Sequence, residues 1–175
     1  EGLTLFSCQH VTNIISGDII DLPQTLEHIY VTGDNTLIGD IANISVNTTL
    51  FKVSGNSALT GDVADLKEGL LDFLCNGSNT ISGNIDDLPS SLLNFDLLGL
   101  NTTSGDIANL PSGLISYTNN GSNTTFGDIT SLPSTLTEFK NLGNNVINGN
   151  IASLPLNMEN FNITGNNTLS GSISS

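Results

Sequence analysis

The sequence predicts a β-rich, right-handed solenoid in which eight coils of 22 residues stack as one continuous domain. Two series of glycines recur at this spacing, and apolar residues alternate with polar ones between them. A fixed period of this length is typical of solenoids, in which each repeat forms one coil that packs on its neighbours. The two series are Gly17, Gly39, Gly61, Gly83, Gly105, Gly127, Gly149, Gly171 and Gly33, Gly55, Gly77, Gly99, Gly121, Gly143, Gly165.

The inward-facing positions of each coil predict one short parallel strand. We number the coil positions 1 to 22, with position 1 at Pro23 and its equivalents. Positions 7 and 9 are mostly apolar, and the residues that follow alternate with the period of two that extended chain requires. Position 7 is occupied by Ile29, Phe51, Phe73, Phe95, Tyr117, Phe139 and Phe161.

The connection into each strand is predicted to be a short 3-10 or helical turn over residues 21–26 and their equivalents, with no long helix anywhere. Position 21 is always Asp, Asn or Ser, whose side chains accept hydrogen bonds from nearby backbone N–H groups. Five of the seven following coils begin with Pro, which is tolerated in the first turn of a helix.

Position 13 is Asn in every coil except the one with Ser57. An inward-facing Asn in each coil can bond the backbone of its own coil and of the next one, which satisfies buried polar groups. We therefore expect a structural ladder of asparagines. Its members are Asn13, Asn35, Asn79, Asn101, Asn123, Asn145 and Asn167.

Together these positions read Leu-x-x-Phe-x-Ile-x-Gly-x-Asn-x-Leu-x-Gly-x-Ile, which resembles the leucine-rich repeat with one extra residue before the Asn. The resemblance covers residues 17–175. The sequence of residues 105–114 is also similar to leucine-rich repeats of bacterial and bacteriophage surface proteins. The resemblance implies that the strands line a concave face where partners bind.

Residues 1–16 fit the repeat worst, and we interpret them as an atypical N-terminal coil or cap before the solenoid of residues 17–175. A strict 22-residue period places Ser7, instead of an aromatic residue, at position 7. Cys8 precedes Cys75 by three coils, which is about 14 Å and too far for a disulfide. Cys75 is expected to be a core residue.

The chain is strongly acidic, with three Lys, 17 Asp or Glu and a formal net charge of −14. Nucleic acids and anionic membranes bind basic surfaces, so neither is an expected partner. No apolar run approaches the roughly 18 residues of a membrane helix, which argues against membrane insertion. The abundance of Asn, Thr, Ser and Gly favours an extracellular protein or one on a cell or virion surface.

The sequence shows no constellation of catalytic residues, and we expect neither an enzyme nor a cofactor. His10 and His28 have no nearby ligands at metal-binding spacing, so no metal site is expected there. Position 18 is Asp in five coils. These carboxylates are interpreted as solvated turn residues, with a calcium-binding column as the alternative.

The outward strand positions 6, 8 and 10 vary from coil to coil, as they would on a surface that recognises a particular partner. Four leucines in this region are predicted to form an apolar patch, with scattered surface leucines as the alternative. The candidate partner face comprises His28, Tyr30, Lys52, Leu74, Asp96, Leu98, Leu100, Lys140 and Leu142.

These features predict a non-catalytic recognition or adhesion module that binds a protein or glycan through its strand face. The alternative is a structural protein whose copies stack end to end into a filament. A partial row of threonines at position 14 raises ice binding as a minor alternative. The row consists of Thr36, Thr80, Thr102, Thr124 and Thr168.

Overall fold

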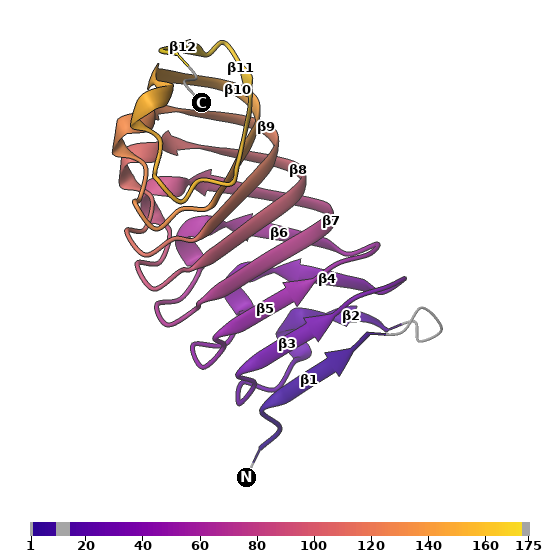
Figure 1. Cartoon of the computed structure of the whole chain (residues 1–175). Helices are drawn as coiled ribbons and strands as arrows, with labels where there is room; N and C mark the ends of the chain where they lie inside the picture. Colours follow the sequence, from indigo (N-terminus) through magenta and orange to yellow (C-terminus); the bar gives the residue numbers. More distant parts are fainter. Residues whose placement is uncertain (1, 10–14, 173–175) are drawn as a thin grey trace.

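The computed structural model describes residues 2–9 and 15–172 as one stack of coils, with the two termini at opposite ends (Figure 1). Equivalent strands of neighbouring coils pair in parallel, in the order β1-β3-β5-β7-β8-β9-β10-β11. The predicted β-rich solenoid is therefore confirmed. The strands of this first sheet are β1 (Leu5–Cys8), β3 (His28–Val31), β5 (Leu50–Val53), β7 (Asp72–Asn84), β8 (Asn94–Asp106), β9 (Ser116–Asp128), β10 (Glu138–Asn150) and β11 (Asn160–Gly165).

Each coil also contains a second strand segment, which the expectation of one strand per coil did not include. In the first three coils and the last coil this segment is separate, whereas in β7 to β10 both segments belong to one 13-residue strand. The second segments pair in parallel along the stack and form a second sheet. The separate segments are β2 (Ser16–Asp18), β4 (Thr36–Asp40), β6 (Ala58–Asp62) and β12 (Thr168–Ser170).

A 3-10 turn follows each second segment and begins two residues before the predicted range of residues 21–26 and their equivalents. The cap is the side chain at position 18, which accepts a hydrogen bond of 2.8–3.1 Å from the backbone N–H at position 20. The predicted capping residue at position 21 is instead the last residue of the turn. These turns are η1 (Ile19–Asp21), η2 (Ile41–Asn43), η3 (Val63–Asp65), η4 (Ile85–Asp87), η5 (Ile107–Asn109), η6 (Ile129–Ser131) and η7 (Ile151–Ser153). A second turn lies within the predicted range, where the backbone N–H at position 4 donates to the carbonyl at position 1, as Leu26 does to Pro23 at 3.1 Å.

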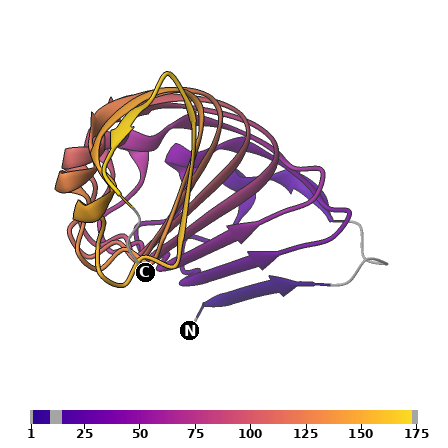
Figure 2. The same ribbon diagram turned by 45° about the horizontal axis from the view of Figure 1, so that its top comes forward.

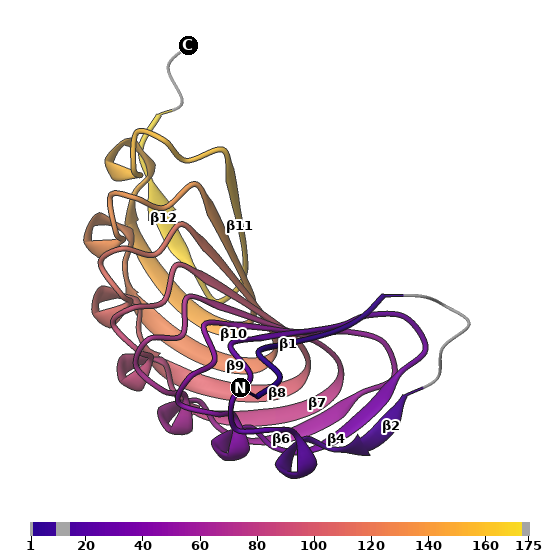
Figure 3. The same ribbon diagram turned by 90° about the horizontal axis from the view of Figure 1, so that it is seen from below.

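The stack is curved, and the two sheets occupy different sides of each coil. Viewed near the stack axis, β1, β3 and β5 lie along one side of the coils and the 3-10 turns along another (Figure 2). The turns follow the outer side of the curve, whereas β1 and β11 lie on its inner side (Figure 3). The first sheet therefore lines the concave side of the solenoid.

Aromatic side chains at position 7 stack along the interior. Successive ring centroids from Phe51 to Phe161 are 5.3–5.9 Å apart, with interplanar angles of 15–24°. Such offset stacking adds about 0.5–1.5 kcal/mol per pair to the gain from burial. The stack therefore fixes one coil relative to the next.

The first coil joins the same sheet in a register that a strict 22-residue period does not predict. Phe6, and not Ser7, pairs with Ile29, and Cys8 pairs with Val31. The first coil is therefore one residue longer, which returns Phe6 to the aromatic position and turns Cys8 inward. Within the described residues, Cys8 and Cys75 are both buried and free.

The position-13 side chains are buried in the described inner coils and connect neighbouring coils. From Asn35 to Asn167, each Asn Oδ1 accepts a hydrogen bond of 2.8–3.2 Å from the backbone N–H at position 15 of the preceding coil. Ser57 makes the equivalent bond through its hydroxyl to the N–H of Leu37. Several Nδ2 atoms, such as that of Asn101, donate to a carbonyl of the following coil. Asn13 lies outside the described residues.

We expect Asn101→Ala to destabilise the protein by about 1–3 kcal/mol, because it leaves the buried N–H of Ile81 without an acceptor. Asn120→Ala is the matched control, since the side chain of Asn120 is exposed. Urea denaturation of the two variants measures the difference. Equal shifts of the denaturation midpoint would contradict a structural role for Asn101.

Candidate binding face

The outward side chains of the first sheet form an open groove over β7 to β10. Parallel pairing aligns position 8 of these strands, so that Leu74, Asp96, Thr118 and Lys140 form one row across the coils. The groove has a volume of about 430 Å³, within the usual range for ligand-binding clefts. We call it the central groove. It is lined by Asp72, Leu74, Asn94, Phe95, Asp96, Leu98, Ser116, Thr118, Glu138, Lys140 and Leu142.

The structure brings five of the nine predicted face residues together in the central groove. They are Leu74, Asp96, Leu98, Lys140 and Leu142. Three others lie on strands nearer the N-terminus, namely His28 and Tyr30 on β3 and Lys52 on β5. There the Lys52 ammonium group lies over the Tyr30 ring, 5.0 Å from its centroid.

Leu100 does not line the groove, so the predicted patch of four leucines contains three. Its side chain is 72% exposed. The pairing of β8 with β9 shifts register between Leu97 and Asn101, where the chain bends away from the first sheet. Alternation along the strand therefore no longer places Leu100 on the same face as Leu98.

Polar residues at position 6 complete one side of the groove, and the sequence-based candidate set did not include them. Asn94 Nδ2 donates to Asp72 Oδ1 at 2.5 Å, and Ser116 Oγ donates to Glu138 Oε2 at 3.1 Å. Glu138 also forms an ion pair with Lys140. Each hydrogen bond joins residues 22 positions apart, so the repeat itself carried the signal that these side chains are neighbours.

Asp96 is the least satisfied charged group of the groove. Its Oδ1 atom is buried and accepts no hydrogen bond from any described residue. Burial raises the pKa of Asp96 above its usual range, with the Glu138 charge acting in the same direction and Asn76, Lys140 and Lys52 in the opposite one. The Lys140 partner, by contrast, lowers the pKa of Glu138. Lys140 is thus engaged by Glu138, while Asp96 has an unpaired oxygen.

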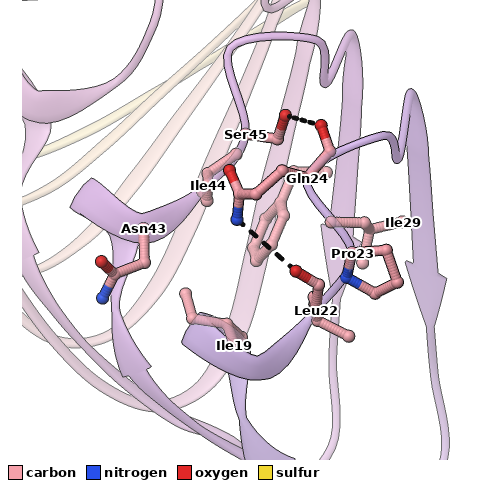
Figure 4. Close-up of a pocket in the computed structure, with 9 residues that line it drawn as sticks. Ile19, Leu22, Pro23, Gln24, Ile29, Asn43, Ile44 and Ser45 are labelled. Atoms are coloured by element: carbon pink, nitrogen blue, oxygen red, sulfur yellow. Dashed lines mark hydrogen bonds between the residues drawn. The ribbon is translucent and has the colours of Figure 1, made fainter.

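A second, much smaller gap lies between the first two 3-10 turns. Gln24 Nε2 donates to the Leu22 carbonyl at 3.5 Å, and Ser45 Oγ donates to the Gln24 carbonyl at 2.6 Å (Figure 4). The gap has a volume of about 10 Å³, roughly the space that one water molecule needs. It is a packing defect between coils and offers no room for a ligand.

The position-18 carboxylates act as caps of the 3-10 turns. Among residues 2–9 and 15–172, no group of three or more His, Cys, Asp or Glu side chains is arranged to hold a metal ion. His28 is exposed on β3, and His10 lies outside the described residues. Within the same described ranges, no helix is long and apolar enough to cross a membrane.

Neither the protein-family models nor the curated proteins contain a match to this sequence. Among solved structures, the plant peptide hormone receptor RGFR1, in complex with RGF2, is similar with a TM-score of 0.58 and 21% identity. The alignment covers 91% of this chain and 31% of the receptor chain, so this chain spans less than a third of that structure. The fold is that of a leucine-rich-repeat solenoid.

Proposed function

We propose that this chain is a non-catalytic recognition module that acts outside the cell and binds a protein partner through the central groove. The observation that carries the proposal is the groove itself, which joins three leucines to charged and polar side chains on the concave side of the coils. Binding sites typically combine apolar surface with a few polar groups that orient the ligand.

The arrangement of the groove favours a protein over a glycan. Its apolar surface comes from the partly exposed side chains of Leu74, Leu98 and Leu142, whereas Phe95 and Tyr117 beneath it are fully buried. No aromatic face of these two coils is therefore open to a sugar ring. The similar receptor structure contains a peptide hormone receptor with its bound partner RGF2, which is compatible with a peptide or protein ligand here.

The proposal is tested with a displayed library of random 12-residue peptides selected on the immobilised protein. We expect a family of enriched peptides whose binding is lost when Leu98 or Leu142 is replaced by Asp, because a buried charge would face apolar peptide side chains. Leu100→Asp is the matched control, since Leu100 is exposed outside the groove. Circular dichroism confirms that each variant is folded.

Two results would count against a groove-dependent module. The first is a selection that enriches no peptides, and the second is a set of enriched peptides that bind the Leu98→Asp and Leu142→Asp variants as well as the unmodified protein. Light scattering on the same samples tests the alternative of end-to-end assembly. Linear oligomers that grow with protein concentration would favour a filament, because head-to-tail contacts that do not close into a ring propagate without limit.

A further inference from the structure

We propose that the central groove selects a partner segment that carries a Lys or Arg side chain between aliphatic residues, and that Asp96 recognises the basic group. This inference rests on the proposed function and names the chemistry of the partner. It assigns to Asp96 the role of a specificity-determining residue, and to the surrounding leucines the role of contacts for the flanking aliphatic side chains.

The first observation is the half-buried carboxylate of Asp96, which lines the groove. Its Oδ1 atom is buried against the protein, so a ligand in the groove can reach only the remaining part of the carboxylate. A carboxylate that has lost part of its hydration gains from a new hydrogen bond and from an opposite charge. Because a carboxylate only accepts hydrogen bonds, the ligand must supply donors, and Lys and Arg side chains supply N–H donors together with a positive charge.

The second observation is the imbalance of charge in the groove. Its lining includes three carboxylates, those of Asp72, Asp96 and Glu138, but a single cation, Lys140. Within the described parts of the chain, the Lys140–Glu138 ion pair is the only salt bridge, so this cation is already engaged. The whole chain has a net charge of −14, which attracts basic partners and repels acidic ones.

The third observation is the position of Asp96 between leucines. Leu74 lies beside Asp96 on the neighbouring strand β7, and Leu98 is two residues further along β8, on the same face. A basic side chain that reaches Asp96 would lay its aliphatic stem along this apolar surface. Residues next to it in the partner would contact the leucines. The groove thus fits a basic residue with aliphatic neighbours better than a run of basic residues.

The test uses the same random 12-residue peptide library at physiological ionic strength, selected in parallel on the unmodified protein and on Asp96→Asn. We expect Lys or Arg flanked by aliphatic residues to be enriched on the unmodified protein. On Asp96→Asn the basic preference should disappear while the aliphatic preference remains. An enriched basic peptide should bind Asp96→Asn at least tenfold more weakly, whereas its copy with Gln in place of the basic residue should bind both proteins equally.

Asp65→Asn is the control for general electrostatic attraction. Asp65 is exposed on η3, so its replacement removes the same charge outside the groove. Equal Lys and Arg enrichment on Asp96→Asn and on the unmodified protein would overturn the inference. So would an equal loss on Asp65→Asn, which would show that only net charge matters. Peptides that depend on Leu98 but not on Asp96 would retain the proposed function and refute this inference alone. Peptides that depend on neither would refute both.

Discussion

Gly55→Ala is expected to destabilise the protein by more than about 4 kcal/mol, in the range that prevents folding of many domains. Gly55 occupies position 11, where the chain bends between the two sheets, and its φ is +106°. A methyl group at this residue would overlap the backbone carbonyl oxygen of Gly33 in the preceding coil. Because that oxygen belongs to the backbone, it cannot move aside without separating the two coils.

Substitutions at two other glycines separate the contribution of backbone strain from that of steric overlap. Gly69 has a similar φ of +96°, but an added methyl group would meet nothing within 4 Å. Gly69→Ala should therefore cost only the backbone strain, about 1–3 kcal/mol. At Gly113, outside the left-handed region, the methyl group would make an ordinary contact of 3.6 Å with Leu93. Gly113→Ala should be neutral or slightly stabilising.

The free energies of unfolding of the three variants, measured in urea, decide between steric overlap and backbone strain. The expected order of stability is Gly113→Ala, then Gly69→Ala, then Gly55→Ala. If Gly55→Ala and Gly69→Ala were equally destabilised, the close approach of neighbouring coils would not be the reason for glycine at position 11.

The glycine registers made the fold predictable because, from Gly39 in one register and Gly55 in the other, an added side chain would overlap the preceding coil. At position 17, for example, a side chain on Gly39 would overlap the carboxylate of Asp18, which caps the 3-10 turn of the preceding coil. The same pairing of glycine and cap recurs one coil later, at Gly61 and Asp40. A constraint imposed by stacking must recur with the period of the stack, and it is therefore visible in sequence.

The candidate site was less predictable because it depends on departures from the repeat. The bend after Leu97 removes Leu100 from the groove, although an uninterrupted alternation of the sequence would have placed it with Leu98. The extra residue in the first coil similarly brings Phe6 to the aromatic position that the strict period gives to Ser7. Such shifts follow from local hydrogen bonding and carry no periodic signal. That one oxygen of Asp96 is buried and unpaired could be learned only from the structure.

Two apolar columns of the core are interrupted by polar residues, and the structure shows that the interruptions are paired. Position 15 is Thr103 and Thr125 in successive coils, and position 9 of each following coil is Asn119 or Asn141. Asn119 Nδ2 donates to Thr103 Oγ1 at 2.7 Å, and Asn141 Nδ2 donates to Thr125 Oγ1 at 2.6 Å. All four side chains are fully buried. Each Asn therefore depends on the Thr of the coil before it.

Neighbouring coils fill the same space with apolar pairs. Ile81 at position 15 precedes Leu97 at position 9, and Ile147 precedes Ile163. The interior of a coil thus accepts either two aliphatic side chains or a Thr with an Asn. The Thr–Asn pairs satisfy the Asn Nδ2 atoms, although the Oδ1 atoms of Asn119 and Asn141 are buried without a partner among the described residues. A pair of Asn with an aliphatic residue would leave the Nδ2 atom without this partner as well.

Thr125→Ile alone is therefore expected to destabilise the protein by about 1–3 kcal/mol, since it leaves the buried amide of Asn141 unpaired. Asn141→Leu alone should cost less, because the Thr125 hydroxyl still donates to Asn145 Oδ1 at 2.8 Å. Combining the two substitutions should recover most of the loss. In a double-mutant cycle measured by urea denaturation, we expect a favourable coupling energy of about 1–2 kcal/mol.

The equivalent cycle one coil earlier supplies the matched comparison. Asn119 Nδ2 also donates to the Tyr117 hydroxyl at 2.8 Å. Thr103→Ile therefore leaves this Nδ2 atom with one hydrogen-bond partner. We therefore expect Thr103→Ile to cost less than Thr125→Ile, and the coupling between Thr103 and Asn119 to be smaller than that between Thr125 and Asn141. If the changes in the free energy of unfolding at Thr125 and Asn141 were additive, the two side chains would not stabilise each other. Their joint occurrence in the sequence would then have another cause.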